Sequence, residues 1–418
     1  MGFHISNGVL EKYTEEEGVT EAVIPYKVKA IGGEAFYGCT NLKSVTIPRS
    51  VKTIGCCAFA DCSNLKSITI PDSVTSIDDC AFYGCSNLTS VSIPDSVTSI
   101  SGNAFEGTKW FSEYPDDFVI RENGILFAYK GKENILSIPD SVTNIGDDAF
   151  YKCKCLTGIT IPNSVISIGY NAFEGCVNLT SITIPDSVTS IDDYAFYGCG
   201  VITKYNGCKK VVHIPYGVTE IGQSAFMDHN EIESVTLPDS ITGIGANAFL
   251  GCDAMKSINI PQGVRKIDDN AFLCCESLRK IVLPDSVTEL GMWCFSECKS
   301  LRTVWLPESI RNIGALAFNH TKWLDEYPED FITVNGILIC YKGDDTTVEI
   351  PAGVKIIASQ AFNECKKVGK ICIPESVKRI CKNAFTSCEA LHSLEIHNSL
   401  KVPKCAFDDC GEVAVTIA

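Results

Sequence analysis

The stretch LKSITIPDSVTSIDDCAFYGCSN, residues 65–87, decides the fold because it returns along the chain at a fixed spacing. Residues 88–107 read LTSVSIPDSVTSISGNAFEG, and residues 179–199 read LTSITIPDSVTSIDDYAFYGC. The Ile/Leu-Pro pair recurs every 23 residues, except for intervals of 45, 30 and 44. Its prolines are Pro25, Pro48, Pro71, Pro94, Pro139, Pro162, Pro185, Pro215, Pro238, Pro261, Pro284, Pro307, Pro351 and Pro374. This period predicts a stack of repeated coils and excludes separate globular domains.

Each repeat is expected to form one coil of a solenoid. Leu65, Ile68 and Ile70 alternate with polar residues, which predicts a short strand with one buried face. Pro71 lacks an amide N–H and ends that strand, and residues 78–82 are expected to form a capped helical turn. One coil cannot bury its own apolar face, so stacked neighbours generate the core, with strands about 4.8 Å apart in a parallel sheet. The predicted fold class is therefore an α/β-type repeat solenoid.

The ordered pattern Leu-x-x-Ile-x-Ile-Pro-x-x-Val-x-x-Ile-Gly-x-x-Ala-Phe-x-x-Cys-x-x-Leu resembles that of the BspA-like leucine-rich-repeat family, over essentially the whole chain. The resemblance implies a right-handed superhelix with a parallel β-sheet on its concave face and short helical turns or loops on its convex face. It also implies a bacterial or protist surface or secreted protein with an adhesive or binding role and no catalysis. Ligands belong to individual family members, so no functional residue is carried over.

Composition narrows the classes of partner. The chain has 51 acidic and 35 basic residues and a net charge of −16, which repels nucleic-acid phosphates and anionic lipid headgroups. No apolar run approaches the roughly 20 residues that span a bilayer, so no membrane insertion is expected. The first residues, MGFHIS, lack the basic stretch and apolar core of a secretory signal, which leaves a cytoplasmic location as the alternative.

The 23 cysteines mostly follow the repeat, and no Cys-x-x-Cys motif supports a zinc ribbon or a thioredoxin-type site. Twelve occupy one position of the coil, here called the cysteine ladder: Cys39, Cys62, Cys85, Cys153, Cys176, Cys199, Cys252, Cys275, Cys298, Cys365, Cys388 and Cys410. We expect free core thiols there, with disulfides between stacked coils as the alternative. Outside the ladder, Cys56, Cys57, Cys274 and Cys372 are candidate reactive thiols.

A longer duplication overlies the short period. The segment 8–13 recurs at 200–205, which predicts two homologous arrays, 1–199 with an N-terminal cap and 200–418 with a C-terminal cap, in one continuous stack. The long intervals contain matching inserts at 108–118 and 321–331, each followed by Asn-Gly-Ile-Leu. Their aromatic residues, Trp110, Tyr114, Trp323 and Tyr327, have two interpretations. They are ligand-binding anchors on a protruding loop, or they fill the core of a divergent coil, which we favour because large aromatic side chains mostly bury.

No catalytic, metal or cofactor site is predicted. The Gly243-x-Gly245-x-x-Ala248 segment resembles a dinucleotide loop, but the ordinary repeat accounts for it and no βαβ unit surrounds it. The six histidines lie on different coils without ligand spacing, and acid pairs such as Asp78-Asp79 recur from coil to coil. Catalytic carboxylates need a unique environment, so repeated pairs indicate turn capping and solvation.

The outer face of the sheet is the most informative surface. Residues two and four before each proline should face outward. In the first half these are mostly Ser and Thr, whereas the second half carries Val211/His213, Ser257/Asn259, Lys280/Val282, Thr303/Trp305, Thr347/Glu349 and Lys370/Cys372. A cationic, aromatic patch is formed by Lys280, Val282, Thr303 and Trp305, and we predict that it is the ligand-binding site. The alternative is that these residues reflect sequence drift on a surface without a selected function. The predicted function is a monomeric, non-enzymatic module that binds a protein or glycan, a host-derived one included, through the concave face. An intracellular scaffold for protein–protein interaction is the alternative.

Overall fold

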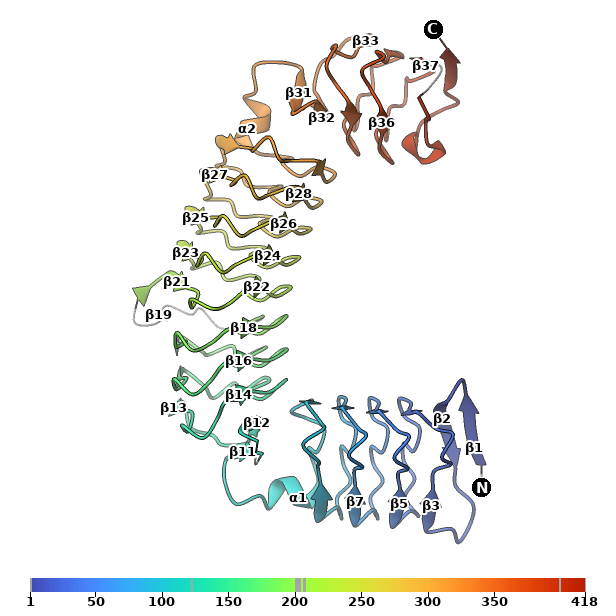
Figure 1. The fold of residues 1–418 in the computed structure, drawn as a ribbon, viewed down its shortest axis with the longest axis vertical. Helices are drawn as coiled ribbons and strands as arrows, with labels where there is room; N and C mark the ends of the chain where they lie inside the picture. The colour runs from blue at the N-terminus through green and yellow to red at the C-terminus, as the bar shows by residue number, and fades with distance from the viewer. Residues whose placement is uncertain (1, 122, 200–203, 206–207, 398–399, 418) are drawn as a thin grey trace. The chain divides into compact units, whose positions relative to one another are not determined.

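The computed structural model describes residues 2–121, 123–199, 204–205, 208–397 and 400–417 (Figure 1). The chain divides into two compact units, residues 1–200 (unit 1) and 201–418 (unit 2). The predicted boundary between the two arrays falls at 199/200, and residues 200–203 lie outside the described residues.

The strand before each proline forms as predicted. These strands pair in parallel with the equivalent strand of the next coil, so that Ser67, Ile68 and Thr69 lie opposite Ser90, Val91 and Ser92. In unit 1 they are β3 (Glu21–Val23), β5 (Ser44–Thr46), β7 (Ser67–Thr69), β9 (Ser90–Ser92), β13 (Ile135–Ser137), β15 (Gly158–Thr160) and β17 (Ser181–Thr183). In unit 2 they are β21 (Val211–His213), β23 (Ser234–Thr236), β25 (Ser257–Asn259), β27 (Lys280–Val282), β29 (Thr303–Trp305), β33 (Thr347–Glu349) and β35 (Lys370–Cys372). Two further strands, β37 (Ser393–Ile396) and β38 (Ala414–Ile417), continue the parallel pairing after β35 without an Ile/Leu-Pro pair.

Each coil also has a second, two-residue strand that the sequence analysis did not predict. It lies in the Val-Thr-Ser-Ile segment after the proline, where Ser76 and Ile77 pair in parallel with Ser99 and Ile100. In unit 1 these strands are β4 (Ala30–Ile31), β6 (Thr53–Ile54), β8 (Ser76–Ile77), β10 (Ser99–Ile100), β14 (Asn144–Ile145), β16 (Ser167–Ile168) and β18 (Ser190–Ile191). In unit 2 they are β22 (Glu220–Ile221), β24 (Gly243–Ile244), β26 (Lys266–Ile267), β28 (Glu289–Leu290), β30 (Asn312–Ile313), β34 (Ile356–Ile357) and β36 (Arg379–Ile380).

The segment expected to form a helical turn is instead a series of tight turns. Cys80 has a φ of 53°, in the left-handed region, which interrupts a right-handed helix. The amide of Phe82 donates to the carbonyl of Ala104 in the next coil at 2.7 Å, and the amide of Cys57 donates to Asp79 at 2.9 Å. The prediction of a helical turn was wrong because amides along this segment alternate between two kinds of partner. Those of Cys57 and Phe82 bond to the next coil, whereas that of Tyr83 closes an isolated turn with the Cys80 carbonyl at 2.9 Å.

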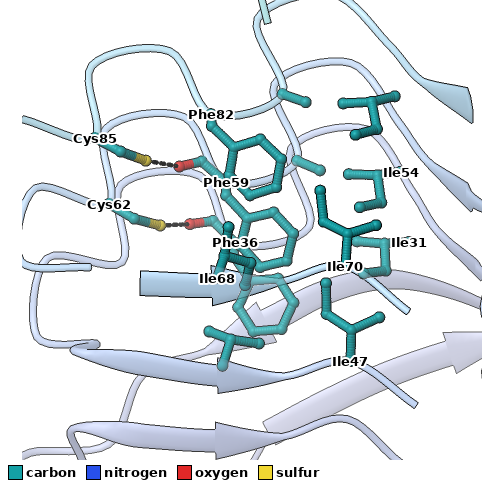
Figure 2. Packing of buried hydrophobic residues seen from close by; sticks show 14 of the residues in the cluster. Ile31, Phe36, Ile47, Ile54, Phe59, Cys62, Ile68, Ile70, Phe82 and Cys85 are labelled. Atoms are coloured by element: carbon teal, nitrogen blue, oxygen red, sulfur yellow. Dashed lines mark hydrogen bonds between the residues drawn. The ribbon is translucent and has the colours of Figure 1, made fainter. Parts of the chain in front are cut away.

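The core of each unit is a column of aromatic rings flanked by aliphatic side chains. Figure 2 shows Phe36, Phe59 and Phe82 stacked in register, with ring centroids 4.7 and 5.1 Å apart and Ile31 and Ile54 beside them. Burying one such side chain contributes about 1.5–3 kcal/mol, and a stacked coil gains this on both of its faces. Stacking therefore supplies the stability that a single coil lacks.

Three antiparallel hairpins each start a run of coils. They pair β1 (Gly2–Ser6) with β2 (Val9–Thr14), β11 (Phe118–Ile120) with β12 (Ile125–Tyr129), and β31 (Phe331–Val334) with β32 (Ile337–Tyr341). The second strand of each hairpin pairs in parallel with β4, β14 or β34, so it occupies the place of a two-residue strand. The remaining elements are α1 (Lys109–Ser112), α2 (Lys322–Asp325), β19 (Lys204–Tyr205), β20 (Cys208–Lys209) and the short 3-10 helix η1 (Lys404–Ala406).

Candidate binding surface

Parallel pairing in unit 2 brings the four predicted binding residues together. In β27 the side chain of Ile281 is buried, whereas Lys280 and Val282 face solvent, as the alternation predicted. The register sets Lys280 opposite Thr303 of β29 and Val282 opposite Trp305. The two strands therefore present one continuous surface, which we call the Trp305 patch: Lys280, Val282, Thr303 and Trp305.

The Trp305 patch has the chemistry of a contact surface. The side chain of Trp305 is 65% exposed and that of Val282 is 47% exposed. Within the described part of the chain, no residue pairs with the ammonium of Lys280 or the indole N–H of Trp305. An exposed indole beside an unpaired cation can stack on a sugar ring or an apolar side chain and donate hydrogen bonds at its edge.

Over β5, β7 and β9 the corresponding face of unit 1 is hydroxyl-lined, whereas β3 and β13 carry the exposed aliphatic residues Val23 and Ile135. A shallow groove of about 570 Å³ runs over β5, β7 and β9, and Arg49 and Asp72 supply charge in its lining. The outward residues in this groove are Ser44, Thr46, Ser67, Thr69 and Ser92. This groove offers neither an exposed aromatic ring nor an unpaired lysine among its lining residues, which distinguishes it from the Trp305 patch.

The insert aromatics pack against the core. The ring of Trp110 lies edge-on to Phe105 with centroids 5.0 Å apart, and Tyr114 lies 6.0 Å beyond it. In unit 2, Trp323 contacts Phe318 at 4.9 Å and Tyr327 at 5.7 Å in the same way. All four insert side chains are half-buried, which agrees with the divergent-coil interpretation.

A threonine in place of the ladder cysteine starts each insert helix. The hydroxyl of Thr108 donates to the Phe105 carbonyl at 2.7 Å and accepts from the amide of Phe111 at 3.1 Å. Thr321 makes the equivalent contacts with Phe318 and Leu324. A hydroxyl is a good N-cap, so this substitution changes a turn into a helix. The sequence analysis recorded these threonines but missed their meaning.

A crevice of about 290 Å³ lies in unit 1 beside the free edge of β10, and Ile100, Arg121 and Asp147 are in its lining. The guanidinium of Arg121 donates to the carbonyls of Pro94, at 2.7 Å, and Val97. Its side chain is 10% exposed, and burial lowers its pKa. The arginine therefore supplies the Val97 carbonyl with a donor, a role that a serine of the next coil has in an ordinary coil, as Ser73 has for Val51. The Pro94 carbonyl also accepts from the Val97 amide.

The described ladder cysteines are free thiols, as we favoured. Most buried ladder Sγ atoms donate to the carbonyl of a phenylalanine in the preceding coil, as Cys62 does to Phe36 at 3.1 Å and Cys85 to Phe59 at 3.0 Å (Figure 2). Burial raises the pKa of Cys388 to about 12. A thiol with this pKa stays protonated at neutral pH, so Cys388 is a core group with little nucleophilic character.

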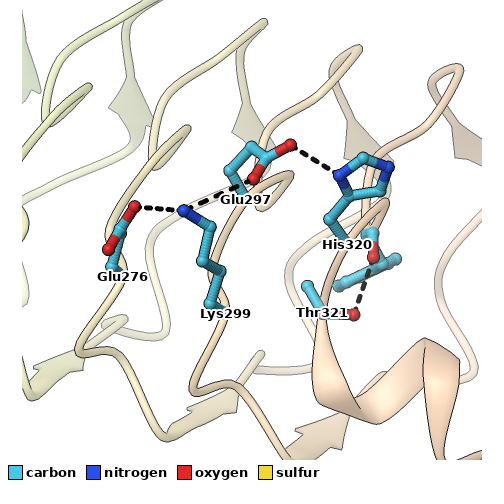
Figure 3. Close-up of polar contacts among 6 residues, drawn as sticks. Glu276, Glu297, Lys299, His320 and Thr321 are labelled. Atoms are coloured by element: carbon cyan, nitrogen blue, oxygen red, sulfur yellow. Dashed lines mark hydrogen bonds and ion pairs between the residues drawn. The ribbon is translucent and has the colours of Figure 1, made fainter.

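Unit 2 carries a chain of exposed ion pairs that the sequence did not reveal. Figure 3 shows Lys299 contacting Glu276 at 2.5 Å and Glu297 at 3.9 Å, while Glu297 also meets His320 at 2.7 Å. Glu276 and Lys299 are 23 residues apart, so the repeat itself brings them together. Exposed pairs of this kind contribute little to stability, and none makes a catalytic pocket.

Two features considered in the sequence, the dinucleotide-like segment and metal ligation, can be compared with the described residues. Gly243 and Ile244 form the repeat strand β24 and not a nucleotide loop. Within the described ranges, no group of three or more His, Cys, Asp or Glu residues is placed to hold a metal ion. Nor do those ranges contain a helix whose length and apolar character suit a membrane span.

One signal for the hairpins was present in the sequence. Asn-Gly followed by Val/Ile-Leu-x-x-Tyr begins at Asn7, Asn123 and Asn335, each at the turn between two hairpin strands. Asn335 and Gly336 have φ values of 52° and 78°, as a two-residue hairpin turn requires. The sequence analysis compared the two later copies with each other but not with the first.

Stacked parallel strands, a buried phenylalanine column and one consensus per coil define a leucine-rich-repeat solenoid. The sequence matches the family described as BspA type leucine rich repeat region (6 copies) over residues 11–114, 123–218, 219–328 and 340–416. The chain therefore belongs to the BspA-type leucine-rich-repeat family.

Several solved structures are similar to the chain. A leucine-rich repeat protein from Bacteroides ovatus ATCC 8483 is 27% identical, with 100% of this chain and 97% of that chain covered and a TM-score of 0.43. The T. pallidum leucine rich repeat protein is 29% identical over 44% of this chain and 86% of its own, with a TM-score of 0.40. A leucine rich cell surface protein from Faecalibacterium prausnitzii A2-165 is 24% identical over 100% of this chain and 92% of its own, with a TM-score of 0.32. No curated protein matches the chain. Because the TM-scores are below 0.5, the assignment rests on the family match and the coil register.

Proposed function

We propose that the protein is a non-catalytic binding module that recognises a protein or glycan through the Trp305 patch. The observation that carries this proposal is the pairing of Val282 with Trp305, two exposed apolar side chains in direct register on neighbouring strands. Aromatic anchors with an adjacent cation are characteristic of residues that dominate binding energy. In this proposal the patch lies on the concave face of a right-handed superhelix, and the protein acts as a monomer.

The family supports a place at the cell surface or in the secreted fraction, where a host-derived ligand would be met. BspA-type proteins are typically surface-associated, and leucine-rich-repeat proteins generally bind partners without catalysis. An extended array of coils offers a rigid surface, so little ordering is required on binding.

The experiment screens the full chain against immobilised glycans and extracellular matrix proteins, followed by affinity measurements on each ligand found. Trp305→Ala should weaken binding at least about tenfold, and Lys280→Ala by a smaller factor. The matched control is Trp293→Ala, because Trp293 is 39% exposed but lies in a turn segment. Unchanged affinity in Trp305→Ala, or an equal loss in Trp293→Ala, would remove this site.

An intracellular scaffold is the second candidate, and the free thiols of the described residues favour it. Labelling intact source cells with an impermeant amine reagent separates the two. Tagging of this protein, with a cytosolic control left untagged, supports the surface module. Protection equal to that of the cytosolic control supports the scaffold.

A further inference from the structure

Three thiols outside the cysteine ladder meet at one place on unit 1. The Sγ atoms of Cys56 and Cys57 lie 3.5 Å apart, and the thiols of Cys57 and Cys80 are close enough to influence each other's pKa. Cys56 is exposed, whereas Cys57 and Cys80 are partly exposed. The ladder thiols are turned toward carbonyls in the core, so this cluster is chemically different from them.

The repeat places two of these cysteines in equivalent positions of adjacent coils. Cys57 and Cys80 are 23 residues apart, and both have left-handed backbones, with φ of 54° and 53°. The neighbouring pair Thr53 and Ser76 is in register, and Phe59 stacks on Phe82 at 5.1 Å. Equivalent residues in stacked strands have a Cα separation of about 4.8 Å, inside the range that a disulfide spans.

We propose that Cys57 and Cys80 form a disulfide between coils and that Cys56 is the thiol through which it exchanges with solution. The overall reaction with a low-molecular-weight disulfide is RSSR + Cys57–SH + Cys80–SH → Cys57–S–S–Cys80 + 2 RSH. The protein loses two electrons and two protons, and the small disulfide accepts both. No metal-binding arrangement of three such residues exists among the described residues, so oxidation is the chemistry that this cluster supports.

The order of steps follows from exposure and contact. The Cys56 thiolate attacks RSSR, forms Cys56–S–S–R and releases RS⁻, which takes the proton that Cys56 lost. Cys57 then attacks the Cys56 sulfur and releases the second RSH, giving a bond between adjacent residues. Cys80 attacks the Cys57 sulfur next and transfers its proton to the departing Cys56 thiol. The bond between adjacent residues is strained, which drives this last exchange toward the link between coils.

The local environment sets the expected rate. Burial, together with the hydrogen bond to Cys57, raises the pKa of Cys56 to about 11. Since the thiolate is the attacking species, exchange should be slow at neutral pH and should accelerate as the pH rises toward 11. This dependence separates the cluster from a low-pKa redox sensor.

The test incubates the reduced, folded full chain with oxidised glutathione, blocks remaining thiols with N-ethylmaleimide, and maps tryptic peptides by mass spectrometry. Cleavage after Lys52, Lys66 and Lys109 yields peptide 53–66, with Cys56 and Cys57, and peptide 67–109, with Cys80. The expected product is a cross-link of these two peptides, with N-ethylmaleimide on Cys56.

Variants identify the bonded sulfurs. Cys57→Ser and Cys80→Ser should abolish the cross-link, while Cys62→Ala and Cys85→Ala, which remove ladder thiols of the same peptides, should keep it. Cys56→Ser should reach the same product at least about tenfold more slowly. Circular dichroism confirms that each variant is folded.

Three results would overturn the proposal: a bond confined to Cys56 and Cys57, a cross-link that survives in Cys57→Ser, or full N-ethylmaleimide labelling of all three thiols after oxidation. Cys274 and Cys372, which lie outside the ladder, serve as controls that form only mixed disulfides with glutathione.

Discussion

The two inserts have the same backbone conformation but differ in side-chain packing. The difference lies where each insert meets the hairpin that follows it, which we call the joint. Both begin with a threonine cap and a tryptophan packed edge-on against a phenylalanine. In unit 1, Phe111 and Phe127 fill the joint with rings 6.2 Å apart. In unit 2 the equivalent residues are Leu324 and Ile339, and they line a cavity of about 80 Å³. A repeated motif therefore reproduces the chain path, while the packing depends on the individual side chains.

The polar contacts of the two joints differ as well. In unit 1 the hydroxyl of Ser101 donates to the carboxylate of Asp148 at 2.7 Å, and Arg121 binds two carbonyls. In unit 2 the equivalents of Ser101 and Asp148 are Gly314 and Gln360. The Oε1 atom of Gln360 is buried without a hydrogen-bond partner within the described residues. The joint of unit 1 thus has the direct Phe111–Phe127 contact and the more complete hydrogen bonding, although Phe127 also lines the crevice of about 290 Å³ beside β10.

The largest loss of stability is expected from replacing the tryptophan that both inserts have in common. Trp110→Ala and Trp323→Ala should each lower the free energy of unfolding by about 3 kcal/mol, because each removes a large ring packed on the core. Urea unfolding of the full chain measures this, and Trp305→Ala is the exposed control. A loss as small as that of the control would show that the insert aromatics are not core groups.

A second pair of variants exchanges the side chains that pack in the two joints. Phe111→Leu with Phe127→Ile should cost unit 1 about 2 kcal/mol, since it opens the cavity that unit 2 already has. Leu324→Phe with Ile339→Phe should stabilise unit 2 by about 1 kcal/mol or less, because filling a cavity competes with strain. Thermal unfolding reports both, and a stabilised first variant would contradict the comparison.

Arg121 is the polar residue that unit 2 lacks, since Val334 and Asn335 stand where Arg121 to Asn123 lie in unit 1. Arg121→Met keeps the aliphatic stem and should cost about 1.5 kcal/mol, because it leaves two carbonyls without a charged donor. Asn335→Ala, which removes a 2.8 Å bond to the Pro307 carbonyl, should cost less. Equal losses in the two variants would indicate that the charge adds nothing.

The smallest effect is a dependence on pH that comes from the joint of unit 1. Burial raises the pKa of Asp148 above its ordinary value of 3.8, so the folded state holds this proton more tightly than the unfolded state. The contribution of Asp148 to the free energy of unfolding is therefore fully present below about pH 3.8, and it is lost as the pH rises through the pKa of the folded state. Asp148→Asn should thus be more stable than the parent at pH 7, by about 1 kcal/mol or less, and equal to it at pH 3. Gln360→Asn, at the equivalent position, should show the same difference at both pH values.

The sequence predicted much of the fold and part of the site. The alternation before each proline correctly placed Ile281 inside and Trp305 outside, because strand periodicity is a local property. It did not predict the strand at Ser76–Ile77 or the turns around Cys80. In the strand and in the turns, backbone amides donate to carbonyls of another coil. Local secondary-structure propensity carries no information about such partners.

The 23-residue repeat by itself determined that this protein is a solenoid, which side chains form its core, and that the Trp305 patch faces solvent. These follow from a pattern that every coil obeys with its own residues. Only the tertiary structure decided that Phe111 contacts Phe127 in one joint while Leu324 and Ile339 line a cavity in the other, and that Cys57 lies close to Cys80 of the next coil. Each of these depends on contacts between residues that are distant in sequence, and stacking the coils is what creates those contacts.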